Sequence, residues 1–428
     1  MLKIGLVSLG CAKNLVDSEN ILGLLKHDGY VIVSSAQESD VIIVNTCGFI
    51  ESSKRESIET IFEMLSYGKP VVVTGCLAER YEKALKEEIP EATFIPIHDY
   101  DKFNELFKSV DKELQEKGGL DDRYRLVSTG HYSTYLKIGE GCDNCCTYCA
   151  IPLIRGHFLS RPFYEIIAEA NLLAETGIKE VIVLEQDTTK YGIDLKEKYN
   201  IVDLLKGLLR IEKLDYIRLL YLYPDEITDE LIDLIASEKR LTSYFDIPIQ
   251  HSEDHILKAM NRRGNKEFLR KLFNKIKEKV PNTVLRTTVM VGFPGETEED
   301  VDNLISFMEE IEFDHLGAFT YSREEDTKSY DFDNQIDEET KKKRLDKVMR
   351  AQQGISYRKN KTHIGEIMEG LVVGKEKEQY LLRSYWNAPD DVDGKIYFSS
   401  DEELNEGDMV KVKITGAFVY DLMGEIIK

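Results

Sequence analysis

Three cysteines in one short segment constrain this chain more than any other feature. Cys142, Cys146 and Cys149 follow the spacing C-x-x-x-C-x-x-C within residues 141–152. Three thiolates at this spacing can hold three irons of a cubane 4Fe–4S cluster, and no fourth cysteine follows nearby, whereas electron-transfer clusters normally have four. The fourth iron would be open for a small molecule to chelate, which indicates a cluster built for chemistry.

The same segment permits a second register. Cys145 makes C-x-x-C-x-x-x-C possible through Cys142, Cys145 and Cys149. A zinc site that uses four of these cysteines is therefore an alternative at this point.

Residues 1–112 alternate between strand and helix patterns. Short β-branched runs predict strands at 3–8, 30–33, 41–44, 71–73 and 93–95, with helical patterns between most of them, such as 18–26 and 56–65. This alternation is typical of a doubly wound parallel sheet.

Three further cysteines each follow one of these strands. Cys11, Cys47 and Cys76 come after the first, third and fourth strands, separated by 36 and 29 residues. The carboxyl ends of parallel strands share one rim, where ligands bind, and a glycine beside each cysteine allows close backbone approach. We therefore predict a second three-cysteine cluster, the alternative being three ordinary buried thiols.

A second strand–helix region spans residues 133–360. Expected strands lie at 135–138, 181–184, 216–220, 244–247, 284–291 and 316–321. Six such strands indicate a complete or partial (β/α) TIM-like barrel, whose working face is the carboxyl rim. The first cysteine motif follows the first of these strands, and so we expect it on that rim. The polar segment 113–132 is the expected linker to the amino-terminal domain.

The last part of the chain has a different character. A charged helix is predicted over 338–361, and we interpret its Lys341–Lys343 and Arg344 as a solvated face. Residues 361–428 then contain runs at 372–373, 380–382, 396–398, 409–414 and 418–420 with glycines between them, which predict a small antiparallel barrel. Such barrels commonly bind nucleic acid, but this one has eight basic against fourteen acidic residues.

The formal charge of −22 has the same consequence for the whole chain. A protein that grips phosphates needs a basic surface, whereas an acidic one attracts basic partners; simple solubility is the alternative reason for this charge. No apolar run approaches the ~18 residues of a membrane span, and the apolar part before Cys11 is too short for a signal sequence. Seven clustered or single cysteines indicate a reducing compartment, and we expect a cytoplasmic protein without a membrane partner.

Residues 141–152, followed by Arg155-Gly156 and Ser160-Arg161, resemble the radical S-adenosylmethionine (SAM) methylthiotransferases. The likeness covers nearly the whole chain: an amino-terminal methylthiotransferase domain (1–112), a radical SAM core (133–360) and a terminal TRAM barrel (361–428). It favours the register Cys142, Cys146, Cys149, although the family usually has a non-cysteine residue at Cys145. The opening 9–19 and the ending 419–425 are very similar to the branch that modifies ribosomal protein S-twelve.

The resemblance implies a reaction and its cofactors. SAM is chelated by the open iron of a 4Fe–4S cluster on Cys142, Cys146 and Cys149, and its reductive cleavage gives a radical that removes hydrogen from an unactivated carbon. A second 4Fe–4S cluster, on Cys11, Cys47 and Cys76, carries or supplies sulfur that another SAM methylates. No catalytic residue beyond these ligands is expected, and the chemistry belongs to the cofactors.

The implied partners follow from the same branch. The substrate is the β-carbon of an aspartate in ribosomal protein S-twelve, free or in the small subunit, and the electron donor is a protein such as flavodoxin or ferredoxin. Sister families instead methylthiolate a modified adenosine next to the anticodon of tRNA; the acidic terminal barrel makes tRNA an unlikely partner here. A non-catalytic iron–sulfur or zinc scaffold is the third hypothesis.

Five positions are expected to support SAM binding. Tyr148 can pack on the adenine, Glu185 and Gln186 end the second core strand where the SAM amine can be met, and Gly292 and Gly295 permit backbone approach to a ligand. Packing, helix capping and an ordinary turn are the respective alternatives.

Three other features have open interpretations. His251 can serve acid–base chemistry, but we favour a hydrogen-bonded structural histidine. Arg262 and Arg263 can contact either substrate or a carboxylate of this acidic chain, and Trp386 can meet a protein partner or pack in the barrel core.

Overall fold

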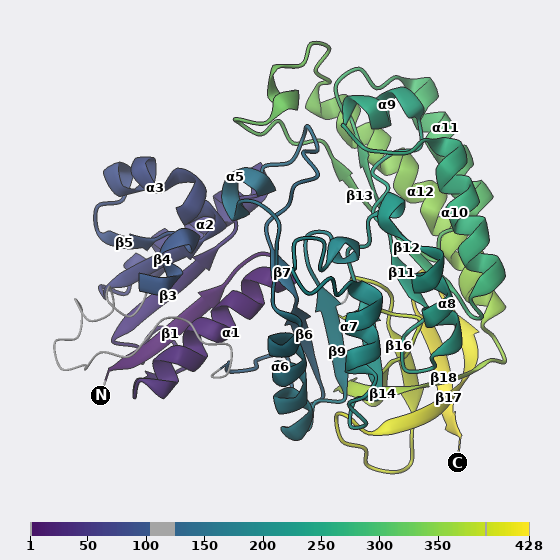
Figure 1. Cartoon of the computed structure of the whole chain (residues 1–428), viewed down its shortest axis with the longest axis horizontal. Coiled ribbons are helices and arrows are strands. Elements are labelled where there is room, and N and C mark those ends of the chain that lie inside the picture. The colour runs from purple at the N-terminus through teal and green to yellow at the C-terminus, as the bar shows by residue number, and fades with distance from the viewer. Residues whose placement is uncertain (1, 103–124, 390–391, 428) are drawn as a thin grey trace.

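The structure is a computed structural model that describes residues 2–102, 125–389 and 392–427 (Figure 1). Part of the predicted linker 113–132 lies outside these residues. Among the described helices, none is both long and apolar enough to cross a bilayer.

The amino-terminal part is a five-stranded parallel sheet, which confirms the predicted architecture, and its strand order is β2-β1-β3-β4-β5. Helix α1 covers one face with Ile21 and Leu25, and α2 and α3 cover the other with residues such as Ile61 and Leu77. The sheet is thus doubly wound. Its elements are β1 (Lys3–Ser8), α1 (Ala12–His27), β2 (Val31–Ile32), β3 (Val41–Thr46), α2 (Glu51–Leu65), β4 (Val71–Gly75), α3 (Cys76–Glu88), β5 (Ala92–Ile95) and η1 (Ile97–Lys102).

The central part contains the six predicted parallel strands in two three-stranded sheets, β6-β9-β10 and β11-β12-β13. A parallel bridge between Ile217 and Leu241 joins the sheets, so they form an open, partial barrel. The strands are β6 (Ser133–Lys137), β9 (Glu180–Leu184), β10 (Tyr216–Leu219), β11 (Tyr244–Asp246), β12 (Val284–Val291) and β13 (His315–Thr320).

Helices alternate with these strands, and their apolar residues form the largest core cluster with the strands. They are α6 (Phe163–Glu175), α7 (Ile201–Leu208), α8 (Asp229–Ser237), α9 (Asp254–Ala259), α10 (Lys266–Lys279), α11 (Glu298–Ile311) and α12 (Glu338–Thr362). Shorter elements are β7 (Gly139–Glu140), α5 (Ile151–Arg155), β8 (Leu159–Ser160), η3 (Thr188–Lys190), η4 (Pro224–Glu226) and η5 (Lys328–Asp331).

The solvated-face interpretation of α12 is wrong for two of its basic residues. Lys341 and Arg344 are buried, because positions three apart lie on the same helix face, and this face packs on the core. Lys341 donates to the carbonyl of Tyr321 at 2.9 Å, and Arg344 pairs with Glu296 at 2.9 Å and with Glu298 at 2.7 Å.

The carboxy-terminal part is a closed barrel, which confirms the predicted barrel, and its strand order is β14-β15-β16-β18-β17. All its pairs are antiparallel except β16–β18. The expected strand at 418–420 is wrong, because a hydrogen bond from Phe418 N to Asp421 O (2.8 Å) closes a turn there. The strands are β14 (Ile367–Glu376), β15 (Gln379–Arg383), β16 (Ile396–Ser399), β17 (Met409–Ala417) and β18 (Leu422–Ile427).

This barrel contacts the amino ends of the core strands. Glu180, the first residue of β9, pairs with Arg218 at 2.9 Å, and Arg218 donates to Ser384 O of the barrel at 2.7 Å. At the start of β11, the Tyr244 hydroxyl donates to the barrel's Asp393 at 2.6 Å. The barrel therefore leaves uncovered the opposite rim, at the carboxyl ends of the core strands, where the cysteine motif is expected.

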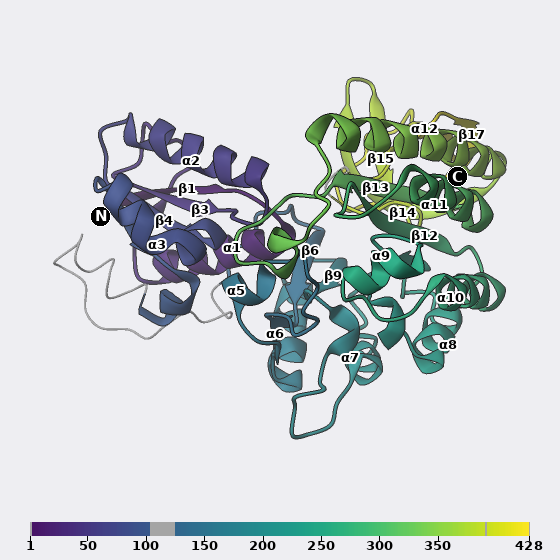
Figure 2. The ribbon, with the colours of Figure 1, turned by 90° about the horizontal axis from the view of Figure 1, so that it is seen from above.

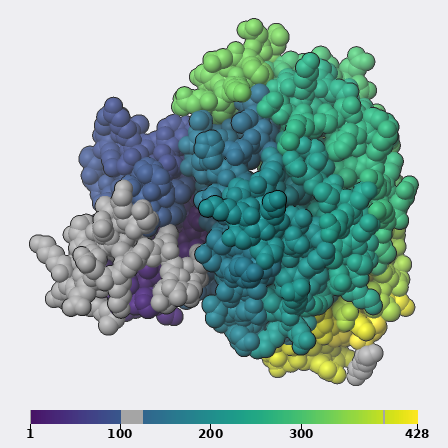
Figure 3. Space-filling model, viewed as in Figure 1, coloured from purple at the N-terminus to yellow at the C-terminus, as the bar shows by residue number. Residues whose placement is uncertain are grey.

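The amino-terminal sheet lies beside the core, at the end of the molecule away from α12 and the barrel (Figure 2). Helix α1 forms much of the contact, since its Val16 shares an apolar cluster with Tyr135 and Ile182 of the core strands. Farther out, Lys54 and Arg80 both pair with Glu324 of the core, at 3.1 and 2.8 Å. In Figure 3 the purple and blue amino-terminal part abuts the teal core along one side.

Candidate active site

The first three cysteines lie at the carboxyl ends of neighbouring strands. Cys11 directly precedes α1, Cys47 follows β3, and Cys76 is the first residue of α3 after β4. Because β1 pairs with β3 and β3 pairs with β4, these strand ends share one rim. The thiols differ in exposure: Cys11 is exposed, Cys47 is half-buried and Cys76 is buried.

The neighbouring glycines bring the three strand ends close together. A Cβ on Gly10 would lie 2.9 Å from the Cβ of Cys47, and one on Gly48 would lie 2.8 Å from the backbone of Leu77. Gly75 has φ +88°, and a Cβ there would meet Asn45 Oδ1 at 2.2 Å. Side chains at these positions would push the cysteine loops apart.

The second cysteine loop is held in shape by its backbone. Cys142 N donates to Gly156 O at 3.1 Å, and Cys149 N donates to Cys146 O at 3.1 Å. Gly141 has φ +76°, and a Cβ there would lie 2.0 Å from His157 O, so glycine is required. Figure 1 shows the loop at the side of the core that faces the amino-terminal part, since α5 leads directly from it.

Cys145 differs from the other three cysteines of this loop. Its thiol is exposed, whereas Cys142, Cys146 and Cys149 are half-buried. Its backbone has φ +52°, in the left-handed region that glycine favours. The carbonyl of Cys145 accepts a hydrogen bond from Asn261 Nδ2 at 3.0 Å.

Within the described ranges, no group of three Cys, His, Asp or Glu side chains is arranged to hold one metal ion. Burial raises the pKa of the Cys76 and Cys142 thiols to about 11 in each case, so metal binding must displace their protons.

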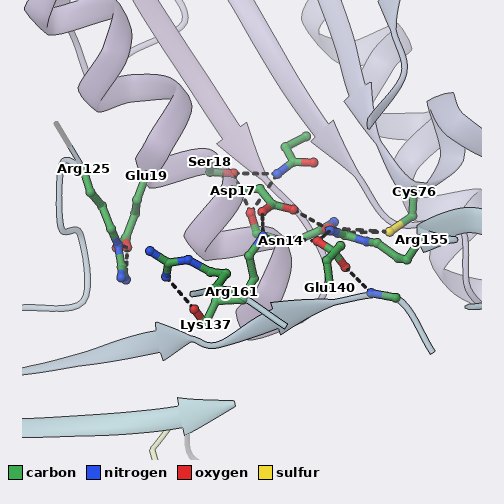
Figure 4. Close-up of polar contacts among 12 residues, drawn as sticks. Asn14, Asp17, Ser18, Glu19, Cys76, Arg125, Lys137, Glu140, Arg155 and Arg161 are labelled. Carbon is green, nitrogen blue, oxygen red and sulfur yellow. Dashed lines mark hydrogen bonds and ion pairs between the residues drawn. The ribbon is translucent and has the colours of Figure 1, made fainter. Parts of the chain in front are cut away.

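A buried polar network joins Cys76 of the first set to Glu140 and Arg155, which flank the second cysteine loop (Figure 4). Arg155, at the end of α5, pairs with Asp17 of α1 at 2.6 Å and with Glu140 at 2.9 Å. Its other guanidinium nitrogen donates to Asn14 Oδ1 and lies 3.5 Å from Cys76 Sγ. One residue of the second cysteine loop's own helix thus touches a thiol of the first set.

Glu185 is a buried carboxyl without a hydrogen-bond partner. It directly follows β9 and its side chain is fully buried. Neither carboxyl oxygen has a hydrogen-bond partner among the described residues. Burial and the nearby charge of Glu140 raise the pKa of Glu185 to about 8. Gln186, beside it, is half-buried and donates to Glu140 at 3.4 Å.

The other predicted SAM-contact positions have protein neighbours. Tyr148 packs on an apolar cluster that includes Phe293 and Tyr321. Gly292 has φ +76°, and a Cβ there would meet the side chain of Lys341 at 2.3 Å, whereas Gly295, at φ +85°, faces open space. The structure therefore gives packing or backbone reasons for these residues, and their role toward SAM stays a prediction.

Burial and pairing bear on two of the open interpretations. His251 is fully buried and accepts a hydrogen bond from Glu253 N at 3.0 Å, which fits a structural histidine. Arg263 pairs with Asp225 at 2.7 Å and Glu226 at 2.9 Å, so it contacts carboxylates of its own chain.

Trp386 lies away from the cysteine sites, whereas Arg262 lies beside one of them. The hypothesis of a partner contact for Trp386 is wrong, because the side chain is fully buried and its ring lies 4.7 Å from that of His315. Arg262 lies 4.1 Å from the Tyr223 ring, and the Tyr223 hydroxyl is 3.6 Å from Cys146 Sγ. Arg262 therefore belongs to the surroundings of the second cysteine set.

Several site residues were not predicted. Asn14, Asp17 and Tyr223 come close to the cysteines only through the fold. Asn14 and Asp17 do lie in the opening segment 9–19, and their spacing of three residues places both on one face of α1. Tyr223 follows a strand at the same rim and had no comparable signal.

Comparisons with known proteins cover all three parts of the chain. Residues 3–96 match the Uncharacterized protein family UPF0004, residues 136–308 the Radical SAM superfamily, and residues 364–427 the TRAM domain. Among solved structures, the radical SAM methyltransferase TsrM from Kitasatospora setae is similar in fold, with a TM-score of 0.56 at 15% identity over 74% of this chain and 73% of that one.

Curated relatives match over the whole length. The Ribosomal protein uS12 methylthiotransferase RimO of Clostridioides difficile is 46% identical, covering 100% of this chain and 99% of its own. The protein of the same name from Aquifex aeolicus is 47% identical, covering 99% and 97%. Identity at this level over full length shows the family, and the chain belongs to the RimO family of radical SAM methylthiotransferases.

Proposed function

We propose that the chain transfers a methylthio group to the β-carbon of an aspartate in ribosomal protein S-twelve (uS12). The observation that carries this proposal is the contact of Arg155, in the helix that follows the second cysteine loop, with Asp17 and with the Cys76 thiol of the first set. Sulfur supply and radical formation must meet at one substrate carbon, and this contact across the boundary between the amino-terminal sheet and the core supports that arrangement.

The proposed cluster ligands are the six cysteines already described. Cys142, Cys146 and Cys149 would hold the 4Fe–4S cluster that binds SAM, and Cys11, Cys47 and Cys76 would hold the second. When bound, these cofactors supply the radical that removes hydrogen and the sulfur that replaces it.

The chain's own residues bind SAM and orient it. The Glu185 carboxyl is buried without a partner, so it can accept hydrogen bonds from the SAM amine where an unpaired acceptor would otherwise cost stability. Tyr148, Gln186, Gly292 and Gly295 are the further proposed SAM contacts. The Tyr223 hydroxyl lies beside Cys146 and Arg262 lies over the Tyr223 ring, so we propose that the two shield that side of the loop.

The acidic chain suits a basic partner. Ribosomal proteins are basic, and a net charge of −22 favours encounter with uS12 over tRNA. We further propose cytoplasmic action, an electron donor such as flavodoxin or ferredoxin, and domain boundaries at 1–112, 133–360 and 361–428.

Mass spectrometry of uS12 tests the proposal. We expect uS12 from cells lacking this gene to lose the methylthio mass on one aspartate, and a plasmid copy to restore it. A copy with Cys146→Ala is the matched control and should not restore it. Loss of a methylthio group from tRNA instead would overturn the proposal and favour the tRNA reaction.

A further inference from the structure

Lys13 places a buried positive charge between the two parts of the site. It lies on α1, two residues after Cys11, and its side chain is 7% exposed. Its ammonium is 3.9 Å from the ring centroid of Tyr221, which follows β10 at the carboxyl rim of the core. The contact therefore spans from the first cysteine set to the core.

The ammonium of Lys13 has no carboxylate partner in the part of the chain that the structure describes. Other cations nearby are paired: the half-buried Lys137 with Asp17 and Glu140, and the buried Arg155 with the same two carboxylates. A buried cation is costly unless it is paired and hydrogen-bonded, and a cation–π contact alone contributes only about 0.5–2 kcal/mol. Lys13 is thus left with capacity for an anion.

One buried carboxyl of the chain, Glu185, does not use that capacity. Glu185 is close enough to influence Lys13 electrostatically, yet both Glu185 oxygens are without a hydrogen-bond partner. The site therefore presents one cation and one carboxyl that are not bonded to each other. A second cation, such as an amine, suits Glu185, and a second anion suits Lys13.

We propose that Lys13, seated on the Tyr221 ring, binds the side-chain carboxylate of the substrate aspartate. This inference rests on the proposed function, because it takes uS12 as the substrate. The contact would hold the β-carbon, one bond from that carboxylate, beside Cys11 and the sulfur source. It also makes Lys13 a specificity residue, since asparagine at the same position would offer no charge.

Affinity of the reconstituted holoenzyme for two forms of uS12 tests this directly. The uS12 protein carries either Asp or Asn at the modified position, and the enzyme is wild type or Lys13→Met. Hydrogen bonds to charged groups contribute about 10- to 100-fold in affinity. We expect the wild type to prefer Asp by about this factor, and Lys13→Met to bind Asp and Asn forms equally at the weaker level.

Lys54 provides the matched control. It also crosses between the two parts and lies near a ring, 5.6 Å from Tyr81, but it is already paired with Glu324. We expect Lys54→Met to keep the preference for Asp, because any change in domain contact affects both forms of uS12 alike. Lys13→Arg should retain part of the preference, since it keeps the charge.

Two results would overturn the inference. One is a Lys13→Met enzyme that weakens binding of the Asp and Asn forms by the same factor. The other is loss of about half the iron in that variant, which would make Lys13 a support of the first cluster. If wild type binds neither form of uS12 but binds tRNA, the proposed function itself fails and this inference falls with it.

Discussion

Removing the Arg155 side chain should loosen the amino-terminal part from the core. Arg155 is 1% exposed, and Asp17, its partner at 2.6 Å, is 4% exposed. At that distance and an effective dielectric constant of about 20, the attraction is about 6 kcal/mol. Removing one partner of a buried pair typically costs about 3–5 kcal/mol, because it leaves an unpaired buried charge.

For Arg155→Met, we expect the contact between the amino-terminal part and the core to lose about 3 kcal/mol of stabilising free energy, near the lower limit of this range. Asp17 keeps Lys137 as a partner, and Glu140 is 28% exposed and can be rehydrated. Hydrogen exchange of the backbone amides in α1 and in the segment after β6 measures this loss. A 3 kcal/mol change corresponds to exchange about 100-fold faster for amides that open when the two parts separate.

Arg270→Met is the control for removing an arginine that is not buried. Arg270 is 32% exposed and pairs with Glu310 and Glu267 on the surface of α10 and α11. Surface ion pairs contribute about 0–1 kcal/mol, so we expect little change in exchange. Equal effects of Arg155→Met and Arg270→Met, both small, would refute the view that Arg155 joins the two sites.

Three further predictions concern single residues. Cys145→Ala should leave the iron content and the SAM-dependent spectrum of the reduced protein unchanged, because the exposed thiol lies outside the proposed ligand set; loss of iron would place it inside. Gly75→Ala should destabilise the amino-terminal sheet and lower the iron content of its cluster, since φ is +88° and the new Cβ would lie 2.2 Å from Asn45 Oδ1. Circular dichroism and iron content at wild-type values would contradict this. Burial alone would raise the pKa of Asp393, but His315, Arg286 and the Tyr244 hydroxyl hold it below its ordinary value; its stabilising contribution is therefore full above about pH 4 and is lost as the pH falls below that, and unfolding of Asp393→Asn followed against pH should lack this acid-dependent loss.

The architecture could be predicted because it depends on local sequence patterns. Strand–helix alternation and cysteines after strands 1, 3 and 4 determine a parallel sheet with one shared rim, and the glycines beside them have the close contacts expected. The error at 418–420 arose because an apolar, β-branched run can also form an exposed turn, and Phe418 is 53% exposed. Local sequence cannot distinguish a strand from such a turn, because a strand forms only where a partner strand is available to pair with it.

The polar contacts of the site could not be predicted, because they join residues far apart in sequence. Arg155 meets Asp17 and Asn14 across more than a hundred residues, and Lys13 meets Tyr221 only where two separate sheets touch. The burial of Lys341 and Arg344 has the same origin: charge predicted a solvated face, but carboxylates of α11 and its preceding turn pair with Arg344 from the core side.

Iron analysis of three forms of the protein tests the central claim, two separate three-cysteine clusters, most directly. After anaerobic reconstitution, the wild type should hold about eight irons per chain, as two 4Fe–4S clusters require. Replacing Cys11, Cys47 and Cys76 with alanine, or replacing Cys142, Cys146 and Cys149, should each leave about four. A wild-type protein with zinc in place of iron, or one whose iron disappears entirely when either set is replaced, would contradict the account.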